Sequence, residues 1–436
     1  MNSYLSKYFV YYPATILKGE SISKHLNAYR NFQYKSKEDI KSSQNLMFQS
    51  ILKHAKESSE YYKEALKDVD IDKFSLVRDI NSVPALSKNQ LINSLDKIQS
   101  NMSLRYETKT TGGSTGQPVS ILKNTDALAR ERAATWRAYE WAGIGVGDAQ
   151  GRFWGVPHSA KAKVKASIID FIANRMRISA FDLDDKSLGN YYKKLLKFRP
   201  KYLYGYVSVI EALANHIDSH NLKPLSGLIS IITTSEVLYP HARLKIEKCF
   251  GIKVFNEYGC GEVGSIAHEC KSGNMHVMAD NLFVETDSTG EIIVTDFHNL
   301  KTPLIRYRTG DFGELSNKPC SCGVTLPLLS KIQGRAYDII KLNSGRSIHP
   351  ESLIYVIEDF KKARNVISQF QAIQTSANNL VINIIPKDDW SSNDAHVINN
   401  KLLETFDSQL SIDINLVDSI QREPSGKMRV VKSLLL

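Results

Sequence analysis

The sequence predicts an α/β protein with a large N-terminal domain of mixed sheets and helices and a small α+β C-terminal domain. Segments with helical spacing alternate with short β-branched runs, a pattern typical of a largely parallel sheet. After Asn281 closely spaced strands follow, and then short helices and strands alternate. The chain has 436 residues, of which 42% are hydrophobic, enough for more than one core.

The individual elements are predicted from the spacing of their apolar residues. The expected helices of the large domain are residues 41–66, 124–142, 188–197 and 207–219. The expected strands between them are residues 202–204, 228–233 and 253–255. A hairpin is expected from residues 282–285 and 291–295, because a Ser-Thr-Gly turn separates them.

The domain boundary is expected near residues 333–338. Residues 1–334 would form the large domain and residues 335–436 the small one. A new run begins at residues 339–342, and the small domain's remaining expected elements are helices 352–360 and 394–406 and strands 379–385 and 412–416.

Charge and hydropathy exclude several classes of protein. The net charge is +10, but the basic residues are spread along the chain, so we expect a solvated surface that attracts anionic nucleotides and no nucleic-acid binding. No apolar run is long enough for a transmembrane helix, no signal peptide is convincing, and five cysteines favour a reducing compartment, so the chain is expected to be cytoplasmic. The aromatic stretch 8–12 is expected to pack on the body of the protein, with contact to a membrane or a partner as the alternative.

The segment Thr110-Thr111-Gly112-Gly113-Ser114-Thr115-Gly116-Gln117-Pro118 is a candidate phosphate-binding loop. Glycines let backbone N–H groups approach phosphate oxygens closely, and the neighbouring hydroxyls add donors. It lacks the Gly-Lys-Ser/Thr ending of a P-loop. Composition alone is equally compatible with a surface loop.

Three later segments favour the phosphate role. Residues 233–236 (Thr-Thr-Ser-Glu) follow one predicted strand, and residues 256–262 (Asn-Glu-Tyr-Gly-Cys-Gly-Glu) follow the next. Open α/β sheets bind ligands at the carboxyl ends of their strands. Residues 307–311 (Tyr-Arg-Thr-Gly-Asp) place a carboxylate on a glycine turn, where it could accept hydrogen bonds from both hydroxyls of a ribose.

In their order and spacing these segments resemble the adenylate-forming superfamily of acyl-CoA synthetases, adenylation domains and luciferases. The resemblance extends from about Phe48 to the C-terminus. It is greatest to the phenylacetate–CoA ligase-like branch, which includes adenylating proteins of capsule and O-antigen clusters and so suggests polysaccharide biosynthesis. It implies an AMP-forming ligase that uses ATP and Mg²⁺.

The resemblance also implies roles for individual residues. The nucleotide-binding positions it implies are Thr111, Gly112, Gly113, Ser114, Thr115 and Gly116 for the phosphates, Ser235, Glu236 and Val237 for the pocket wall, Asn256, Glu257, Tyr258 and Gly259 for adenine, and Asp311 for ribose. Glu262 would lie near Mg²⁺ and act with Lys427, which would bridge the substrate carboxylate and the α-phosphate.

The hinge between the domains departs from the family pattern. Gly334-Arg335 matches the start of the hinge motif, and Arg335 is expected near the ribose or the phosphates. Many relatives carry two acidic residues next, where this chain has Tyr337-Asp338. The resemblance implies that residues 1–334 bind nucleotide and acid and that the small domain, residues 335–436, is a lid. In the family, rotation of this lid separates adenylation from thioester formation, so the missing acidic residue bears mainly on the second half-reaction.

The cysteines suggest a structural zinc site. Cys320 and Cys322 form a Cys-x-Cys knuckle, and Cys270 and His276 could complete a closed tetrahedral set. His268 and Cys260 are alternative fourth ligands, although Cys260 is better interpreted as part of the nucleotide loop. The competing interpretation is a set of unpaired buried thiols.

The expected reaction is activation of a carboxylic acid to an acyl-adenylate with release of pyrophosphate, followed by transfer to CoA. The alternatives are transfer to an amine, for example on a sugar, or to a carrier-protein thiol, and a non-catalytic nucleotide-binding protein. Trp154, Tyr204, Tyr206 and Thr233 are candidates for the acyl pocket or could equally be core. A homodimer is compatible with the sequence.

Overall fold

The computed structural model describes residues 1–110, 119–155, 160–180, 183–316, 318–333, 340–342, 347–348, 350–406, 410–421 and 428–435. The chain forms two compact units, Met1–Gln333 and Gly334–Leu436.

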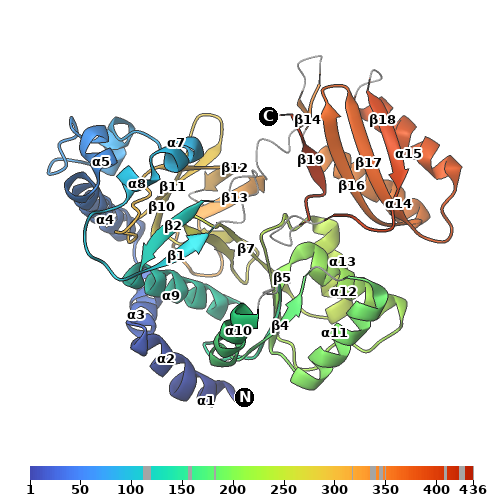
Figure 1. Ribbon diagram of the computed structural model, residues 1–436, viewed down its shortest axis with the longest axis horizontal. Helices are drawn as coiled ribbons and strands as arrows, with labels where there is room; N and C mark the ends of the chain where they lie inside the picture. The colour runs from blue at the N-terminus through green and yellow to red at the C-terminus, as the bar shows by residue number, and fades with distance from the viewer. Residues whose placement is uncertain are drawn as a thin grey trace. The chain divides into compact units, whose positions relative to one another are not determined.

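An eleven-stranded sheet runs through the first unit (Figure 1), in the order β10-β11-β12-β13-β9-β8-β7-β6-β5-β3-β4. The parallel half comprises β3 (Gln150–Trp154), β4 (Arg175–Ser179), β5 (Tyr202–Tyr206), β6 (Ser230–Thr234) and β7 (Val254–Cys260). The antiparallel half continues from β7 through β8 (Gly264–Glu269), β9 (Met275–Val277), β13 (Leu328–Gln333), β12 (Tyr307–Ser316), β11 (Glu291–Asp296) and β10 (Leu282–Thr286). Strand β7 therefore belongs to both halves.

Helices and a separate hairpin complete the first unit. The hairpin pairs β1 (Tyr106–Thr110) with β2 (Ser120–Asn124). The N-terminal helical segments are α1 (Ser3–Leu5), the π-helical η1 (Ser6–Tyr11), α2 (Tyr12–Leu17), α3 (Ile22–Phe32), α4 (Lys37–Ser58), α5 (Glu60–Ala65), α6 (Leu76–Asp79), the 3₁₀ turn η2 (Ile80–Ser82), α7 (Lys88–Asn93) and α8 (Leu95–Ile98). The remaining helices are α9 (Thr125–Trp141), α10 (Ala160–Ile172), α11 (Asp185–Phe198), α12 (Val207–Ser219) and α13 (Pro240–Phe250).

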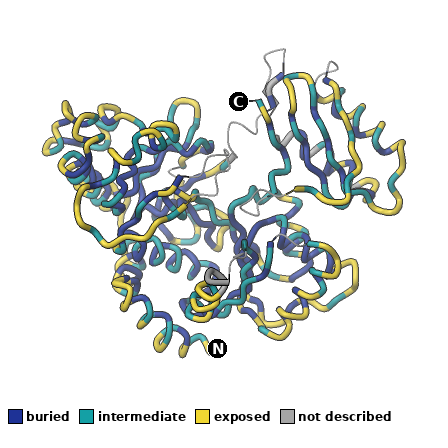
Figure 2. The backbone as a smooth tube through the Cα atoms, viewed as in Figure 1, coloured by how far each residue is buried: buried dark blue, intermediate teal, exposed yellow. Residues whose placement is uncertain are grey.

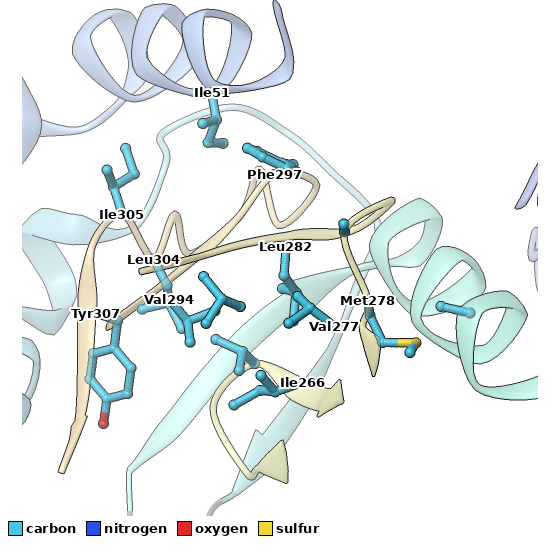
Figure 3. Packing of buried hydrophobic residues seen from close by; sticks show 14 of the residues in the cluster. Ile51, Ile266, Val277, Met278, Leu282, Val294, Phe297, Leu304, Ile305 and Tyr307 are labelled. Atoms are coloured by element: carbon cyan, nitrogen blue, oxygen red, sulfur yellow. The ribbon is translucent and has the colours of Figure 1, made fainter. Parts of the chain in front are cut away.

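The two halves of the sheet have different cores. In the parallel half, apolar residues of α11, α12 and α13 pack on one face, and Tyr139 and Ala142 at the end of α9 pack on the other. The antiparallel half packs against the N-terminal helices. Figure 2 shows buried backbone running through the sheet, and Figure 3 shows Ile51 of α4 above Phe297 and Ile305. These buried surfaces fix the strand ends that carry the candidate site.

The second unit has a four-stranded sheet in the order β18-β17-β16-β19. Its strands are β16 (Ile367–Ser376), β17 (Asn379–Pro386), β18 (Ser411–Leu416) and β19 (Val431–Ser433), and a small pair is formed by β14 (Ile340–Lys341) and β15 (Ser347–Ile348). Its helices are α14 (Pro350–Arg364) and α15 (Ser392–Thr405). This is the α+β composition expected for the smaller domain.

Two expectations about the first unit are corrected. The single helix expected over residues 41–66 is two helices, because Ser59 adopts an extended conformation and its side chain caps α5. The sheet is parallel in only one half, because β7 pairs with β8 in antiparallel fashion. The expected hairpin is confirmed as β10–β11, and α12 has the expected bounds.

Among the described residues, none of the helices combines the length and the apolar composition needed to cross a bilayer.

Candidate functional site

Strand β7 separates two environments because successive side chains point to opposite faces of a strand. Glu257 accepts a hydrogen bond from Tyr139 of α9, with 2.9 Å between oxygens. Tyr258, the next residue, donates its hydroxyl hydrogen to Asp311 of β12 at 3.0 Å. The segment expected around adenine thus contributes to two different sites.

Asp311, which is expected at the ribose, lies against Tyr258, which is expected near adenine. Asp311 is largely buried, and its backbone N–H donates to Thr309 Oγ1 at 3.1 Å. Burial, followed by the nearby Asp311 carboxylate, raises the pKa of Tyr258 well above its usual value. The tyrosine therefore stays protonated, and it orients a carboxylate that can accept from a diol.

Glu262 lies in the turn between β7 and β8, and its side chain is buried. Tyr307 donates to Glu262 Oε1 at 3.1 Å, and Lys88 Nζ is 3.7 Å from the same oxygen. Figure 3 shows the Tyr307 ring at the edge of the apolar cluster, with its hydroxyl directed away from the aliphatic side chains. The core of the antiparallel half thus fixes the position of a carboxylate that can serve a hydrated cation.

The candidate phosphate loop, Thr111 to Gly116, lies outside the described residues, but the hairpin that carries it is described. At its base, Lys123 Nζ is 2.8 Å from Glu131, 3.0 Å from Asp296 and 3.0 Å from the carbonyl oxygen of Val263. The backbone of Val263 follows Glu262 directly, so the base of the hairpin is bonded to the turn that carries Glu262.

Gly264 allows this close approach. Its φ is +94°, and a Cβ at this position would lie 2.5 Å from the carboxyl carbon of Glu131. Burial alone would raise the pKa of Glu131, but Lys109 and Lys123 bond to the carboxylate and hold its pKa at about 2. The carboxylate is therefore charged and held between two ammonium groups.

Ser235, Glu236 and Val237, the expected pocket wall, directly follow β6. Ser235 has a φ of +69°, an uncommon conformation for a residue other than glycine. Glu236 accepts from the backbone N–H of Ser208 at 2.7 Å and from its hydroxyl at 3.0 Å, in the first turn of α12. Glu236 therefore anchors α12, and the strained turn carries the chain on to Val237.

Asn256 precedes the two divergent residues of β7. Its backbone N–H donates to Glu269 at 3.0 Å. Its side-chain oxygen Oδ1 is buried without a hydrogen-bond partner among the described residues. A ligand that supplies an N–H group could donate the hydrogen bond that this buried oxygen lacks.

The other face of β7 is an aromatic and polar cluster. Besides Tyr139, Glu257 accepts from Ser265 at 3.1 Å and from Tyr204 at 3.4 Å. Burial raises the pKa of Glu257. Burial thus disfavours the charged form of this carboxyl, whereas the hydroxyl groups that donate to it act in the opposite direction.

The candidate acyl-pocket aromatics lie together beside this cluster. The Trp154 ring stacks on Tyr206 with 4.6 Å between centroids and lies 5.7 Å from Tyr204. The Arg152 guanidinium lies 4.7 Å from the Trp154 ring centroid and 4.5 Å from that of Tyr204. Thr233 is fully buried in β6.

The structure brings the four cysteine and histidine candidates together. The donor atoms of Cys270, His276, Cys320 and Cys322 all lie within 4.8 Å of one another. The Sγ atoms of Cys270 and Cys320 are 3.6 Å apart, and His276 Nε2 is 3.3 Å from Cys322 Sγ. His276 Nδ1 lies 2.9 Å from the Leu326 carbonyl oxygen, which leaves Nε2 as the ligand atom.

The alternative fourth ligands lie elsewhere. The His268 ring is 5.8 Å from that of Tyr139, and burial lowers its pKa to about 3, so it is neutral. Cys260 ends β7 next to the Glu262 turn, where burial raises its pKa. Neither belongs to the group of four.

Besides the phosphate loop, the hinge motif at residues 334–338, which includes Arg335, and Lys427 fall outside the described residues.

Sequence reasoning missed several residues that complete these environments. Lys88, Glu131 and Arg152 act through contacts with segments far away in the sequence. Nothing in their local sequence distinguishes them from surface residues. Tyr307 belongs to the motif of residues 307–311, in which only Asp311 was given a role. A role for the tyrosine hydroxyl could have been predicted from the same motif.

Comparison with known proteins identifies related sequences and folds. The family model for the CapK C-terminal domain matches residues 343–434. Protein CapK of Staphylococcus aureus is 28% identical over 401 residues, covering 90% of this chain and 88% of that protein. Phenylacetate-coenzyme A ligase of Thermus thermophilus is 25% identical over 176 residues, covering 37% and 39%.

A crystal structure of 2-hydroxyisobutyryl-CoA ligase, in the postadenylation state with R3-HIB-AMP, shares the fold. Its TM-score is 0.74 at 17% identity, covering 92% of this chain and 91% of that one. This chain is therefore similar in sequence to CapK over most of its length and to a phenylacetate-coenzyme A ligase over part of it, and it shares the fold of 2-hydroxyisobutyryl-CoA ligase.

Proposed function

We propose that this chain uses ATP to activate a carboxylic acid. The acid's carboxylate attacks the α-phosphorus, the bond to the β-phosphate oxygen breaks, and acyl-adenylate and pyrophosphate form. CoA thiol then attacks the acyl carbon, AMP leaves, and a thioester results. The observation that carries the proposal is the pairing of Tyr258 with Asp311 beside the Tyr307–Glu262 pair.

Each part of the nucleotide has a chemically suitable neighbour. Asp311 can accept from the ribose hydroxyls, and the Asn256 side-chain oxygen can accept from the adenine amino group. The phosphates would lie at the loop whose hairpin base is bonded to Val263. Glu262 suits Mg²⁺, which binds through one or two carboxylates together with substrate phosphates and would neutralise charge during transfer.

The names of similar proteins support thioester formation with CoA and a carboxylic acid as the substrate. The names of the Thermus and 2-hydroxyisobutyryl proteins describe CoA ligases, and the latter structure holds an acyl-AMP. The acid would occupy the aromatic region of Trp154, Tyr204 and Tyr206. Lys427 is proposed as the residue that bridges the carboxylate and the α-phosphate, where it would offset repulsion between two anions.

We also propose that Cys270, His276, Cys320 and Cys322 hold a structural Zn²⁺. Three thiolates and one imidazole form a closed tetrahedral set without an open position for substrate. The hydrogen bond between His276 and Leu326 provides the orientation that zinc-bound imidazoles ordinarily have.

The test is acid-dependent exchange of labelled pyrophosphate into ATP, across aromatic acids, short fatty acids and amino acids. CoA-dependent release of AMP with the active acid then measures the second step. Release that requires an amine or a carrier protein instead would replace CoA as the acceptor. Absence of exchange with every acid would refute adenylation.

Substituting Lys427→Ala should abolish exchange while nucleotide binding, measured by calorimetry, changes little. Lys401→Ala removes an exposed lysine from α15 of the same unit and should leave exchange unchanged. Unaltered exchange in Lys427→Ala would contradict the role assigned to this lysine.

A further inference from the structure

The N-terminal helical segments expose an apolar surface that the proposed reaction does not use. The segments α1, η1 and α2 run in succession from Ser3 to Leu17. Large apolar side chains project outward from them, and Phe9 is 69% exposed and Leu17 83%. The other exposed members are Tyr4, Leu5, Tyr8 and Ile16.

The opposite side of these segments is firmly attached to the first unit. Tyr11 is buried and accepts a hydrogen bond from the indole N–H of Trp136 at 2.9 Å, with the two rings edge to face. Ser3 donates to Asp148, and the amide of Asn174 donates to the carbonyl oxygen of Met1 at 3.1 Å. The outward apolar side chains are therefore presented by an ordered helix.

Helix α10 contacts η1 and carries a second exposed apolar stripe. Val164, Ile168 and Phe171 follow a spacing of four and then three residues, so they lie on one side of the helix. They are 62%, 56% and 66% exposed. We name the exposed apolar residues of α1, η1, α2 and α10 the N-terminal face.

The charges of the N-terminal face are basic. The sequence from Met1 to Lys18 contains Lys7 and Lys18 and no acidic residue. Lys7 Nζ lies 4.8 Å from the Tyr8 ring centroid, and Lys18 is exposed. Lys165 of α10 is exposed as well.

The nearby acidic side chains are already neutralised. Asp170, the acidic residue of α10, pairs with Arg175 and with Arg177. Glu20 pairs with Arg132, and Asp148 lies 3.0 Å from Lys201 Nζ. The net field at the face is therefore positive.

We propose that the N-terminal face docks the protein on the surface of an anionic lipid bilayer. Tyrosine and phenylalanine suit the boundary between headgroups and acyl chains, and lysines beside them attract anionic headgroups. A second copy of the chain fits less well, because a symmetric contact would bring the lysines of both faces together.

Flotation of the full chain with vesicles tests the proposal. Binding is expected to phosphatidylcholine vesicles that contain phosphatidylglycerol, weak binding to phosphatidylcholine alone, and weaker binding as salt is raised. Phe9→Ser should lower the partition coefficient about tenfold. Lys18→Gln should lower it about fivefold.

Two matched variants control for general loss of apolar surface. Val77→Ser on α6 and Leu244→Ser on α13 each remove an exposed apolar side chain away from the face, and both should bind like the parent. Pyrophosphate exchange should be unchanged in Phe9→Ser, so the outcome is independent of the proposed reaction.

Three results would overturn docking on lipid. They are absence of binding to anionic vesicles, equal binding by the parent and Phe9→Ser, and a dimer seen by light scattering that Phe9→Ser dissociates. The last result would assign the face to self-association.

Discussion

The two halves of the large sheet bury polar groups in different ways. In the parallel half, Glu257 is surrounded by hydroxyl donors and aromatic rings, and burial raises its pKa. In the antiparallel half and the hairpin beside it, carboxylates are held by cations or tyrosines across long distances in the sequence, as Lys123 pairs with Asp296. The difference indicates that the surroundings of Glu257 disfavour a charge, whereas those of Glu131 and Asp296 hold charges near the proposed phosphate site.

The largest expected effect concerns the metal cluster of the antiparallel half. Cys322→Ala should eliminate one equivalent of bound zinc and lower the free energy of unfolding by about 4 kcal/mol, because a metal that binds only the folded state stabilises it. Metal analysis and urea unfolding measure the two effects.

Cys249→Ala is the matched control, since Cys249 is a buried cysteine of α13 outside the cluster. Equal zinc content in Cys322→Ala and Cys249→Ala would show that the Cys322 thiol is not a zinc ligand.

A charge-reducing change at the ribose side should mainly affect catalysis. If Asp311 binds the ribose as proposed, Asp311→Asn removes the charge that would strengthen hydrogen bonds to the diol, and kcat/KM for ATP should fall about 100-fold, or about 2.7 kcal/mol. Unfolding should change little, because asparagine can still accept from Tyr258. Asp72→Asn, at an exposed aspartate, is the control. A fall in stability without a fall in kcat/KM would assign Asp311 a purely structural role.

The fixed charges predict an acid-dependent loss of stability. The pKa of Glu131 is about 2 when folded and 4.5 ordinarily, so its contribution is complete above pH 4.5 and is lost as pH falls toward 2. Glu131→Gln should lower the free energy of unfolding by about 3 kcal/mol at neutral pH.

The difference between Glu131→Gln and the parent should shrink as pH falls through this window, measured by urea unfolding at several pH values. Glu314→Gln, at an exposed carboxylate paired with Lys331, should have little effect at any pH. A difference that stays constant with pH would contradict the assigned charge.

The smallest effect is expected in the parallel half. Burial raises the pKa of Glu257, so removing its charge should cost little, and Glu257→Gln should change stability by less than about 1 kcal/mol. Thermal unfolding and pyrophosphate exchange measure the result. A large loss comparable with that of Asp311→Asn would mean that Glu257 acts as a charged group and would remove the contrast between the two halves.

Local sequence patterns predicted the elements whose burial is regular. The helix of residues 207–219 has the expected bounds because its apolar stripe is continuous, and the turn before Glu291 identified the β10–β11 hairpin. Strand β16 was missed, since glutamines interrupt its apolar residues. The change of strand direction at β7 was also missed, because a strand's own sequence does not specify its neighbour.

The candidate site was predictable only in part for the same reason. Sequence motifs singled out Asp311 and Glu262 as candidates. Their contacts with Tyr258 and Lys88, respectively, form only when the chain folds and could not be predicted from the motifs. The alternation along β7 could have been applied to separate Glu257 from Tyr258. Contacts such as that between Arg152 and Tyr204 depend on strand order and had no sequence signal.

Gly264 limits which amino-acid substitutions this protein can accept during evolution. A methyl group there would meet the Glu131 carboxylate, which lies between Lys109 and Lys123 at the base of the loop-bearing hairpin. The turn after Glu262 and that hairpin therefore cannot vary independently, since a side chain on one displaces the ion pairs of the other. Mutational drift that enlarges position 264 would first require a compensating change at position 131.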